Sequence, residues 1–285
     1  MRKPKLTYAY KADCLAHISE VDSGLQCGCV CPVCGNHLIA RKGRKTAHHF
    51  AHHNLSECVH AYQTSLHILA KEILSEAAYL TLPKVPVYNN HFMLFGHLSN
   101  TRQIKIESVT LERRIDNIIP DIVITSSNTE LLIEIKVTHG IDEDKLNRIQ
   151  ALDISALEID LSRIDREITK ENLMPILIGD AVEKTWIYNR LSAKYQKMLA
   201  SIATKFFVAN RGLTNHIDYC PIHARKWHGK PYANVVRDCF HCDYLFKYHN
   251  NTYDDKDPDY ILCLGKAKIA NCADLKRYLA QQQST

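Results

Sequence analysis

The chain has 285 residues, 46% of them hydrophobic, and a formal net charge of +5. This length gives room for about two domains at roughly 150 residues each, and the charge permits a polyanionic partner without requiring one. No apolar run approaches the roughly 18 residues that span a bilayer. The basic start also lacks the apolar stretch of a signal peptide. We therefore expect a folded cytoplasmic protein.

Cysteine is unusually frequent, with 11 residues, and most of them fall in or beside two clusters. An odd, clustered set in a chain without a secretion signal favours metal binding over a disulfide framework. We predict two structural zinc sites. One lies in an N-terminal module over residues 1–60 and the other in a C-terminal zinc ribbon over residues 213–285.

The N-terminal cluster is built around the motif CPVCG at residues 31–35. Two thiolates separated by two residues, on a tight turn that Gly35 permits, are typical of a zinc knuckle. The downstream run HFAHHNLSEC supplies the remaining ligands. We predict that Cys31, Cys34, His52 and Cys58 are the ligands, with His49 as the main competitor. Cys27 and Cys29 could replace one of these ligands. The alternative is a group of buried free thiols.

Residues 61–79 have the apolar spacing of an amphipathic helix, with a buried stripe from Leu66 to Ala77. His67 and Lys71 lie four residues apart along one border of this stripe, and Gln63 lies one turn earlier. Side chains at such a border either reach into a neighbouring site or form the solvated edge of the helix.

Residues 118–138 contain two runs rich in Ile and Val on either side of a polar turn, which predicts a β-hairpin. If Ser127 and Asn128 form the loop, opposed positions sum to 255, and Asp121 lies across from Glu134. Opposed residues have Cβ atoms roughly 4.5 to 5.5 Å apart. Because side chains alternate along a strand, Lys136 shares the face of Glu134.

Two opposed carboxylates repel each other, so a divalent cation is a natural compensation. Carboxylate oxygens, with water and substrate phosphate, are the usual ligands of Mg²⁺. We therefore predict Mg²⁺ or Mn²⁺ on Asp121 and Glu134, with Lys136 close to a phosphate or the attacking water. The arrangement resembles the metal centre of the PD-(D/E)XK nucleases. The alternative is a surface hairpin with a cross-strand lysine.

After the hairpin, the sequence predicts a helix from residue 142 to about 152 and a strand at residues 155–161. A strand, a crossover helix and a second strand form a right-handed unit with parallel pairing, so we expect a mixed sheet in a core over residues 61–180. A long helical pattern at residues 183–210 predicts a connecting helix within residues 181–212.

The C-terminal cluster contains the motifs CPIH at residues 220–223 and CFHC at residues 239–242. Their spacing predicts a second zinc site with Cys220, Cys239 and Cys242 as ligands and either His223 or Cys263 as the fourth. Between the motifs lies the basic and aromatic stretch RKWH at residues 225–228. It either stacks on a nucleic-acid base or packs on the domain body.

These motifs together resemble the competence protein CoiA-like family. The resemblance rests on the N-terminal knuckle with HHFAHHNLSEC, on SLHILAKEIL, on PDIV with LLIEIKVTHGIDEDK, and on the C-terminal ribbon. It implies a restriction-endonuclease-like PD-(D/E)XK core with zinc modules and metal-dependent cleavage of DNA. It assigns metal ligands to Asp121 and Glu134, the catalytic lysine to Lys136, and supporting roles to His67 and Lys71.

One position departs from that family pattern, because Gln63 stands where a helix glutamate is common. A neutral amide is a poorer metal ligand than a carboxylate, which leaves open whether one ion or two take part. Two further functions stay open: a non-catalytic zinc-ribbon protein that binds nucleic acid, and a subunit of a larger DNA-processing or defence complex.

Overall fold

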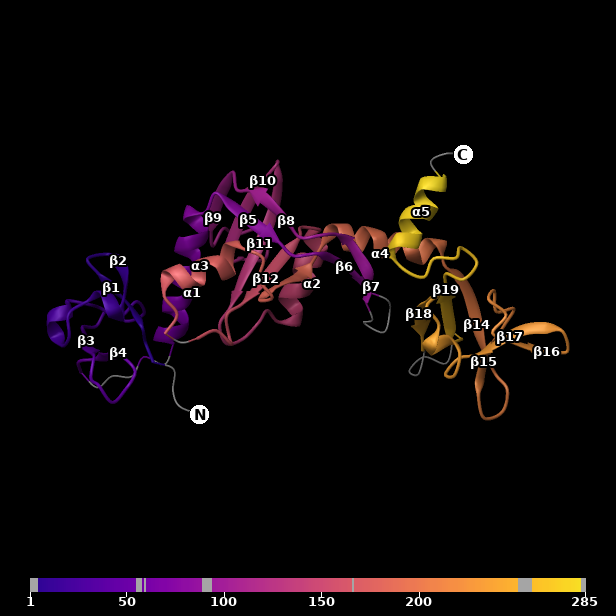
Figure 1. Ribbon diagram of the computed structural model, residues 1–285, viewed down its shortest axis with the longest axis horizontal. Helices are drawn as coiled ribbons and strands as arrows, with labels where there is room; N and C mark the ends of the chain where they lie inside the picture. The colour runs from indigo at the N-terminus through magenta and orange to yellow at the C-terminus, as the bar shows by residue number, and fades with distance from the viewer. Residues whose placement is uncertain are drawn as a thin grey trace. The chain divides into compact units, whose positions relative to one another are not determined.

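The computed structural model describes residues 5–54, 58, 60–88, 94–165, 167–250 and 258–282. The chain forms two compact units, which are described separately (Figure 1). Unit 1 comprises Met1–Pro83 and Thr101–Tyr188, and unit 2 comprises Lys84–Asn100 and Asn189–Thr285. The domain boundaries given by the sequence, at residues 60, 180 and 212, remain predictions.

Unit 1 begins with two short antiparallel hairpins around their own apolar cluster. The 3-10 turns η1 (Ile18–Glu20) and η2 (Leu25–Cys27) connect them. Cys27, Cys29 and Cys31 belong to this cluster together with Leu38 and Phe50. The strands are β1 (Tyr8–Lys11), β2 (Cys14–His17), β3 (Leu38–Arg41) and β4 (His49–His52).

The centre of unit 1 is a five-stranded sheet in the order β13-β12-β11-β10-β9. Strands β11 and β12 are parallel and the other neighbours are antiparallel, so the predicted mixed sheet is confirmed. The strands are β9 (Ser108–Leu111), β10 (Ile122–Ser126), β11 (Thr129–Lys136), β12 (Ala156–Asp160) and β13 (Lys184–Tyr188).

The hairpin of β10 and β11 has the predicted loop and register. Ser127 and Asn128 both adopt positive φ, at 49° and 57°, as the central residues of a tight two-residue hairpin turn do. Ile122 pairs with Ile133, so opposed positions sum to 255. This register places Asp121, which directly precedes β10, at the level of Glu134 on β11.

Helices cover both faces of the central sheet. Helices α1 (Ala61–Glu76) and α3 (Lys170–Ile178) share an apolar cluster with the Ile- and Leu-rich side of the hairpin, and α2 (Glu143–Leu152) packs on the opposite side. The predicted helices at 61–79 and 142–152 are therefore confirmed within a few residues. A two-stranded ribbon of β5 (Tyr79–Leu82) and β8 (Arg102–Lys105) completes this unit.

Unit 2 contains a hairpin, two helices and a larger antiparallel sheet. The hairpin of β6 (Val85–Tyr88) and β7 (Leu94–Ser99) packs with α4 (Arg190–Ile202) and α5 (Cys272–Gln282) in one apolar cluster. The sheet has the order β16-β17-β15-β14-β19-β18. Its strands are β14 (Thr204–Asn210), β15 (Asn215–Asp218), β16 (Arg225–Trp227), β17 (Lys230–Asn234), β18 (Leu245–His249) and β19 (Tyr260–Cys263).

The helix predicted over residues 183–210 is shorter than expected. Strand β13 occupies Lys184–Tyr188, and the helix begins only after Asn189, whose side chain caps it by accepting a hydrogen bond from the Ser192 N–H at 3.0 Å. Strand β14 follows the helix directly. The prediction failed at both ends because β-branched and aromatic residues, which favour strands, continue the apolar pattern of the helix.

Within the described residues, none of the helices combines the length and the apolar character that crossing a membrane requires.

Candidate active site and metal centres

Asp121 lies where the hairpin meets helix α1. Its Oδ2 atom accepts a hydrogen bond from the Ile135 N–H at 2.8 Å, which fixes the carboxylate against β11. Its Oδ1 atom faces the helix, 3.1 Å from Lys71 Nζ and 3.9 Å from His67 Nδ1. Asp121 is therefore held by backbone on one side and by two basic side chains on the other.

A polar cavity of about 420 Å³ opens beside this carboxylate. Three of the predicted helix residues line it together with Asp121. Gln63, His67 and Lys71 lie on one side of α1 because they are spaced one helical turn apart. The lining residues are His60, Gln63, Thr64, His67, Ile68, Lys71, Glu112 and Asp121. The polar border of this helix therefore faces a cavity that has a carboxylate in its wall.

The ionisation of the helix residues depends on this environment. Burial lowers the pKa of His67 below its ordinary value, so the imidazole is largely neutral at pH 7, and its Nε2 atom is buried without a hydrogen-bond partner among the described residues. Burial also disfavours the charge of Lys71, but hydrogen bonds to Glu112 and Asp121 outweigh it and raise the lysine pKa. Lys71 is therefore a fixed positive charge at the cavity.

Glu134 is almost completely buried, and its side chain is only 7% exposed. Lys145 of helix α2 places its Nζ atom 2.7 Å from the carboxylate. That distance applies to both carboxylate oxygens, but only the contact with Oε2 has the geometry of a hydrogen bond. The pKa of Glu134 is raised to about 7, chiefly by burial; Lys145 opposes the rise and the charge of Asp121 adds to it.

Lys136 follows Glu134 on the same side of β11 but does not approach the two predicted ligands. Its Nζ atom lies 2.7 Å from Asp160 Oδ2 and 3.5 Å from Glu158 Oε1. Both carboxylates stand on β12, where the parallel register pairs Glu134 with Glu158 and Lys136 with Asp160. The hydrogen bond to Asp160 raises the pKa of Lys136, so the side chain is charged.

Four polar residues at this site were not foreseen: Glu112, Lys145, Glu158 and Asp160. The strand predicted at residues 155–161 did carry the signal for two of them, because its alternation sends Glu158 and Asp160 to one face. Glu112 follows β9 in a left-handed conformation, with φ of 47°, and nothing in the sequence marks it. Lys145 comes from the crossover helix, whose rotation about its axis is fixed only by packing.

The donor set of Asp121 and Glu134 fits Mg²⁺ or Mn²⁺, since both ions prefer carboxylate oxygens. The buried Oε1 atom of Glu134 lies 2.7 Å from Lys145 Nζ without the geometry of a hydrogen bond, and the charge of Asp121 raises the pKa of Glu134. Each carboxylate also has a lysine partner, Lys71 for Asp121 and Lys145 for Glu134. A cation would therefore share these carboxylates with the lysines.

The N-terminal module brings together the four preferred zinc ligands. The ligand atoms of Cys31, Cys34, His52 and Cys58 all lie within 4.8 Å of one another, and Cys34 Sγ is 3.3 Å from His52 Nε2. Three sulfurs and one imidazole nitrogen are a common structural zinc set. This group can hold a metal ion.

The local backbone explains the arrangement. Gly35 adopts φ of 70° and its N–H donates to the Cys31 carbonyl at 2.9 Å, which closes the turn between the two cysteines. The Val33 N–H approaches Cys31 Sγ at 3.4 Å, as expected for a knuckle. Burial raises the pKa of Cys31 to about 11, whereas the Asn36 N–H lowers the pKa of Cys34.

The competing N-terminal ligands lie elsewhere. His49 Nδ1 lies 2.9 Å from the Ala47 carbonyl, outside the group of four. Cys27 and Cys29 are buried in the apolar cluster of the module, and their thiols donate to the carbonyls of Leu38 and Cys27. These two cysteines pack as small apolar side chains.

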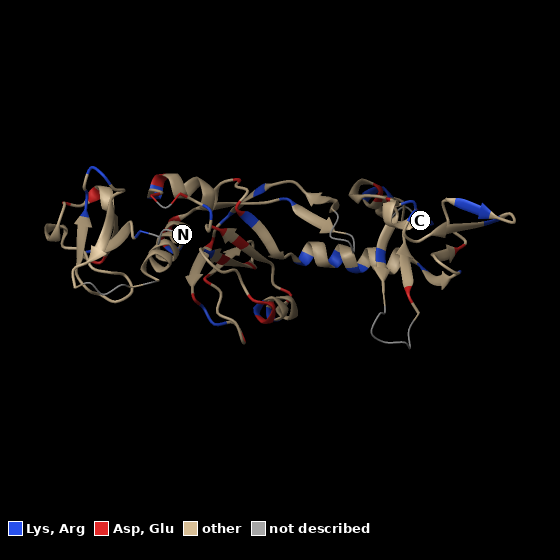
Figure 2. Cartoon of the chain, turned by 90° about the horizontal axis from the view of Figure 1, so that it is seen from below, with Lys and Arg blue, Asp and Glu red and all other residues tan. Residues whose placement is uncertain are grey.

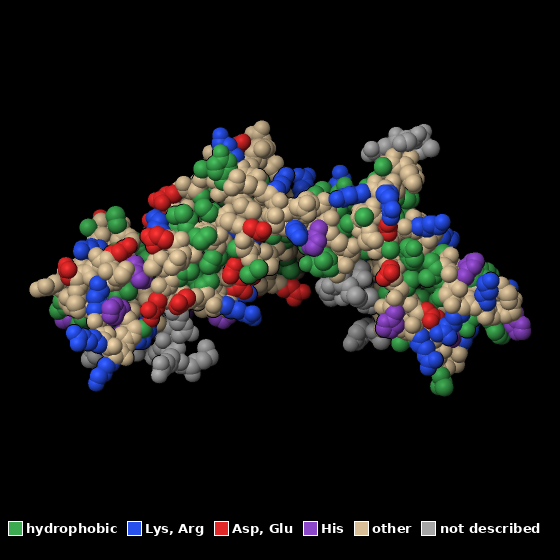
Figure 3. All heavy atoms as spheres, in the orientation of Figure 1, with side chains coloured by type: hydrophobic (Ala, Val, Ile, Leu, Met, Phe, Trp, Pro, Cys, Tyr) green, Lys and Arg blue, Asp and Glu red, His purple; other side chains and the backbone are tan. Residues whose placement is uncertain are grey.

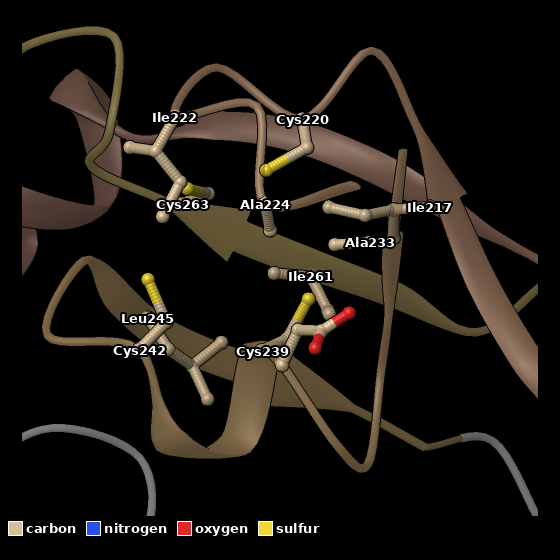
Figure 4. Close-up of a pocket in the computed structure, with 11 residues that line it drawn as sticks. Ile217, Cys220, Ile222, Ala224, Ala233, Cys239, Cys242, Leu245, Ile261 and Cys263 are labelled. Carbon is tan, nitrogen blue, oxygen red and sulfur yellow. The ribbon is translucent and has the colours of Figure 1, made fainter. Parts of the chain in front are cut away.

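In unit 2, four cysteines line one small cavity of about 20 Å³ (Figure 4). Cys220 follows β15, and Cys263 ends β19. Cys239 is the first residue of the 3-10 turn η3 (Cys239–His241), and Cys242 directly follows this turn. Cys263 is thus the fourth lining cysteine, whereas His223 is not in the lining. Among described residues, only the N-terminal group has its ligand atoms within 4.8 Å of one another.

The C-terminal cavity has further features of a zinc ribbon. The Gly265 N–H donates to Cys263 Sγ at 3.3 Å, as in a knuckle. Burial raises the pKa of Cys239 to about 12, and the other three thiols act in the same direction. The other three thiols therefore lie near enough to Cys239 to raise its pKa.

The fold and the N-terminal group define a mixed α/β protein with a Cys₃His set that can bind zinc. Residues 17–61 match the family model described as competence protein CoiA, N-terminal domain. This match covers the N-terminal module and agrees with the resemblance to the CoiA-like family that the motifs predicted. Neither the curated proteins nor the solved structures contain a match to the chain.

Proposed function

We propose that this CoiA-like chain is a metal-dependent nuclease that hydrolyses phosphodiester bonds in DNA. The single observation that carries the proposal is the hairpin register, which sets Asp121 at the level of Glu134 beside a polar cavity of about 420 Å³. The order of elements supports a PD-(D/E)XK core: a helix with polar residues at the cavity, then a hairpin with the two carboxylates, then a parallel crossover to β12.

The chain's own residues have separate tasks in this proposal. Asp121 and Glu134 are the ligands for Mg²⁺ or Mn²⁺, and Gln63 is placed to hydrogen-bond water at the same cavity. Lys71 supplies a fixed positive charge to a substrate phosphate. When bound, the cation supplies charge that stabilises the transition state of phosphodiester hydrolysis.

Lys136 is proposed to orient the attacking water. Its ammonium is positioned by Asp160 and Glu158, so these two carboxylates on β12 act as positioning residues. His67, neutral because of burial, completes the wall of the cavity and offers a ring nitrogen without a described hydrogen bond.

The zinc-binding modules are proposed to hold the DNA through phosphate contacts, with structural zinc on the N-terminal group and on the four C-terminal cysteines. Basic side chains at Arg41 to Lys45 and at Arg225 and Lys226 supply the positive charge. Each phosphate contact on duplex DNA adds about 0.9 to the slope of log affinity against log salt. Affinity that stays constant between low and moderate salt would exclude such a clamp.

The direct test incubates the full-length protein with linear, circular and single-stranded DNA, in the presence of Mg²⁺, Mn²⁺ or no divalent cation. Cleavage that requires the cation and is lost in Glu134→Gln supports the proposal. Intact DNA under every condition, with a folded protein that retains its zinc, would overturn it.

One observation favours a second function, a zinc-ribbon protein that binds nucleic acid without cutting it. Lys71 and Lys145 already compensate the two carboxylates, and Gln63 is uncharged. A purely structural site would have these properties. Tight DNA binding without metal-dependent cleavage would identify this function.

A further inference from the structure

The sheet of unit 2 ends in an exposed basic hairpin that the proposed active site does not use. Strands β16 and β17 are joined by His228 and Gly229, which adopt positive φ of 46° and 78°, so the turn is tight. Trp227 lies opposite Lys230 at this tip and is 63% exposed. A large aromatic ring is thereby presented to solvent next to a lysine.

A second exposed aromatic ring lies beside the first. Tyr219, which directly follows β15, is 65% exposed and adopts φ of 59°, a conformation that is unfavourable for a side chain of this size. Its N–H donates to the Pro231 carbonyl of β17 at 2.8 Å, which holds the residue there. The fold therefore accepts backbone strain at the position that displays this ring.

The two rings are part of one pocket of about 160 Å³. Cavities of roughly 150 Å³ accept a single benzene ring, so the pocket has the size for one flat aromatic group and is far too small for a duplex. Its lining residues are Arg211, Asp218, Tyr219, Trp227, Lys230, Pro231 and Tyr232.

The polar part of the lining offers both donors and acceptors. Arg211 Nη2 donates to both carboxylate oxygens of Asp218, at 2.8 and 2.7 Å, so these two charges compensate each other at the wall. The edge of a nucleobase, which carries donors and acceptors side by side, is complementary to such a pair.

The surroundings of the pocket are positively charged. Lys226 and Lys230 form no ion pair with any described carboxylate, whereas Arg225 is paired with Asp238 at 2.6 and 2.9 Å. In Figure 2, most of β16 has the colour of Lys and Arg. In Figure 3, basic and histidine side chains gather over the same end of unit 2. Uncompensated lysines beside an aromatic pocket suit a ligand that joins a flat ring to phosphate.

We propose that this pocket binds an unpaired base of single-stranded nucleic acid, which stacks on Trp227 while Lys230 contacts a neighbouring phosphate. Stacking of bases on aromatic side chains within a basic groove is how proteins hold single strands without sequence preference. The inference deepens the proposed function, on which it rests for the identity of the substrate, by naming a single-stranded segment as the part that unit 2 holds.

The experiment measures the affinity of the full-length protein for a fluorescently labelled oligothymidylate, by anisotropy, in buffer without added divalent cation. Trp227→Ala should weaken binding roughly ten- to hundred-fold, the range expected when one base–aromatic stack is lost. Trp227→Phe should retain most of the affinity. Tyr79→Ala removes an exposed aromatic ring from unit 1 and should change nothing.

Two further measurements separate stacking from simple charge attraction. An abasic strand of equal length should bind the wild type about as weakly as oligothymidylate binds Trp227→Ala. Oligothymidylate should also quench tryptophan fluorescence in the wild type, and the quenching should be lost in Trp227→Phe. Equal affinity of Trp227→Ala and wild type, or equal binding of the abasic strand, would overturn the proposal.

Because binding is measured without cleavage, the two proposals fail separately. The protein could cleave DNA in a metal-dependent way and bind single strands independently of Trp227. That result would reject the base-binding pocket and support the nuclease proposal. Single-strand binding that depends on Trp227, in a protein that does not cleave DNA, would reject the nuclease proposal and support the base-binding pocket.

Discussion

Lys145 Nζ lies 2.7 Å from the carboxylate of Glu134, which is buried within the sheet. The lysine comes from the crossover helix α2 and the glutamate from β11, so the pair joins the two elements of the parallel unit. A buried carboxylate needs such a partner, because desolvation disfavours its charge. The same carboxylate is a proposed ligand of the catalytic cation.

Replacing Lys145 by Met should therefore destabilise the protein. The loss should be roughly 2 kcal/mol, the typical worth of a hydrogen bond to a charged group, and Glu134 should become largely protonated at neutral pH. Chemical denaturation at pH 7 measures the change. Gln150→Met, an exposed position on the same helix, is the control and should leave the stability unaltered.

Added Mg²⁺ distinguishes a metal site from a structural ion pair in this variant. If Glu134 is a ligand, the cation should raise the melting temperature of Lys145→Met more than that of the wild type, because it replaces the missing positive charge. An equal response of both proteins would show that Lys145 alone is the partner of this carboxylate.

Glu134→Gln should have opposite effects on cleavage and on stability. The amide keeps the shape of the side chain but removes the charge. DNA cleavage should therefore fall by orders of magnitude, because the loss of one such electrostatic contribution raises the activation free energy by roughly 3 kcal/mol or more. The melting temperature should hold or rise, because the buried position no longer disfavours an ionised group. A gel-based cleavage assay and thermal unfolding measure the two quantities.

Glu130→Gln is the matched control for this variant, since Glu130 stands on the same strand and pairs with Arg113 at 2.6 Å outside the site. It should cleave normally. Lys136→Ala should abolish turnover yet spare metal binding. Loss of cleavage in Glu134→Gln together with an equal loss of stability would instead mark Glu134 as a structural residue.

The hairpin and the N-terminal zinc group could be predicted because short-range patterns determine them. Two apolar runs around Ser127 and Asn128 allow one turn and one register, which fixes the level of Asp121 and Glu134. The spacing of Cys31 and Cys34 likewise fixes a knuckle. In both cases the partners are close in sequence or follow a defined period.

The remaining partners could not be predicted, because they depend on tertiary packing. The shift between β11 and β12 is set by how α2 crosses the sheet, so nothing local shows that Lys136 will reach Asp160 rather than Asp121. The same holds for the fourth cysteine at the C-terminal cavity. Cys263 reaches it through the pairing of β19 with β14 and β18, whereas His223, which is closer to Cys220 in sequence, is not in the lining.

Zinc analysis should give two ions per chain. Cys31→Ser should lose one zinc and much of the stability of its module, because binding of structural zinc is coupled to folding. Cys14→Ser, at an exposed cysteine outside the group, should keep both ions. Elemental analysis of the purified variants measures the content.

The C-terminal cavity is tested in the same way. Cys242→Ser should lose the second zinc, whereas Cys272→Ala, at a buried cysteine of a different cluster, should retain it. A wild-type protein with one zinc that Cys31→Ser removes would show that the four C-terminal cysteines are free thiols.

A pH-dependent contribution to stability should come from Lys184, which is 4% exposed. Its Nζ atom donates to the carbonyls of Thr81 at 3.1 Å and Gly179 at 2.6 Å, while the charge of Asp180 opposes the effect of burial without outweighing it. Burial lowers the lysine pKa from 10.5 to about 8. Between these values the folded chain binds fewer protons than the unfolded chain, so this residue's contribution to the free energy of unfolding rises with pH.

Lys184→Met removes this titration, and the comparison with the wild type isolates it from the cysteines and tyrosines that titrate in the same range. The variant should gain stability relative to the wild type at pH 7, because a buried charge is gone, and this relative gain should shrink by up to about 3 kcal/mol as the pH rises to about 10.5. Denaturant unfolding of both proteins at pH 7, 8.5 and 10 measures the difference. A difference that is the same at all three pH values would show that Lys184 keeps an ordinary pKa in the folded protein.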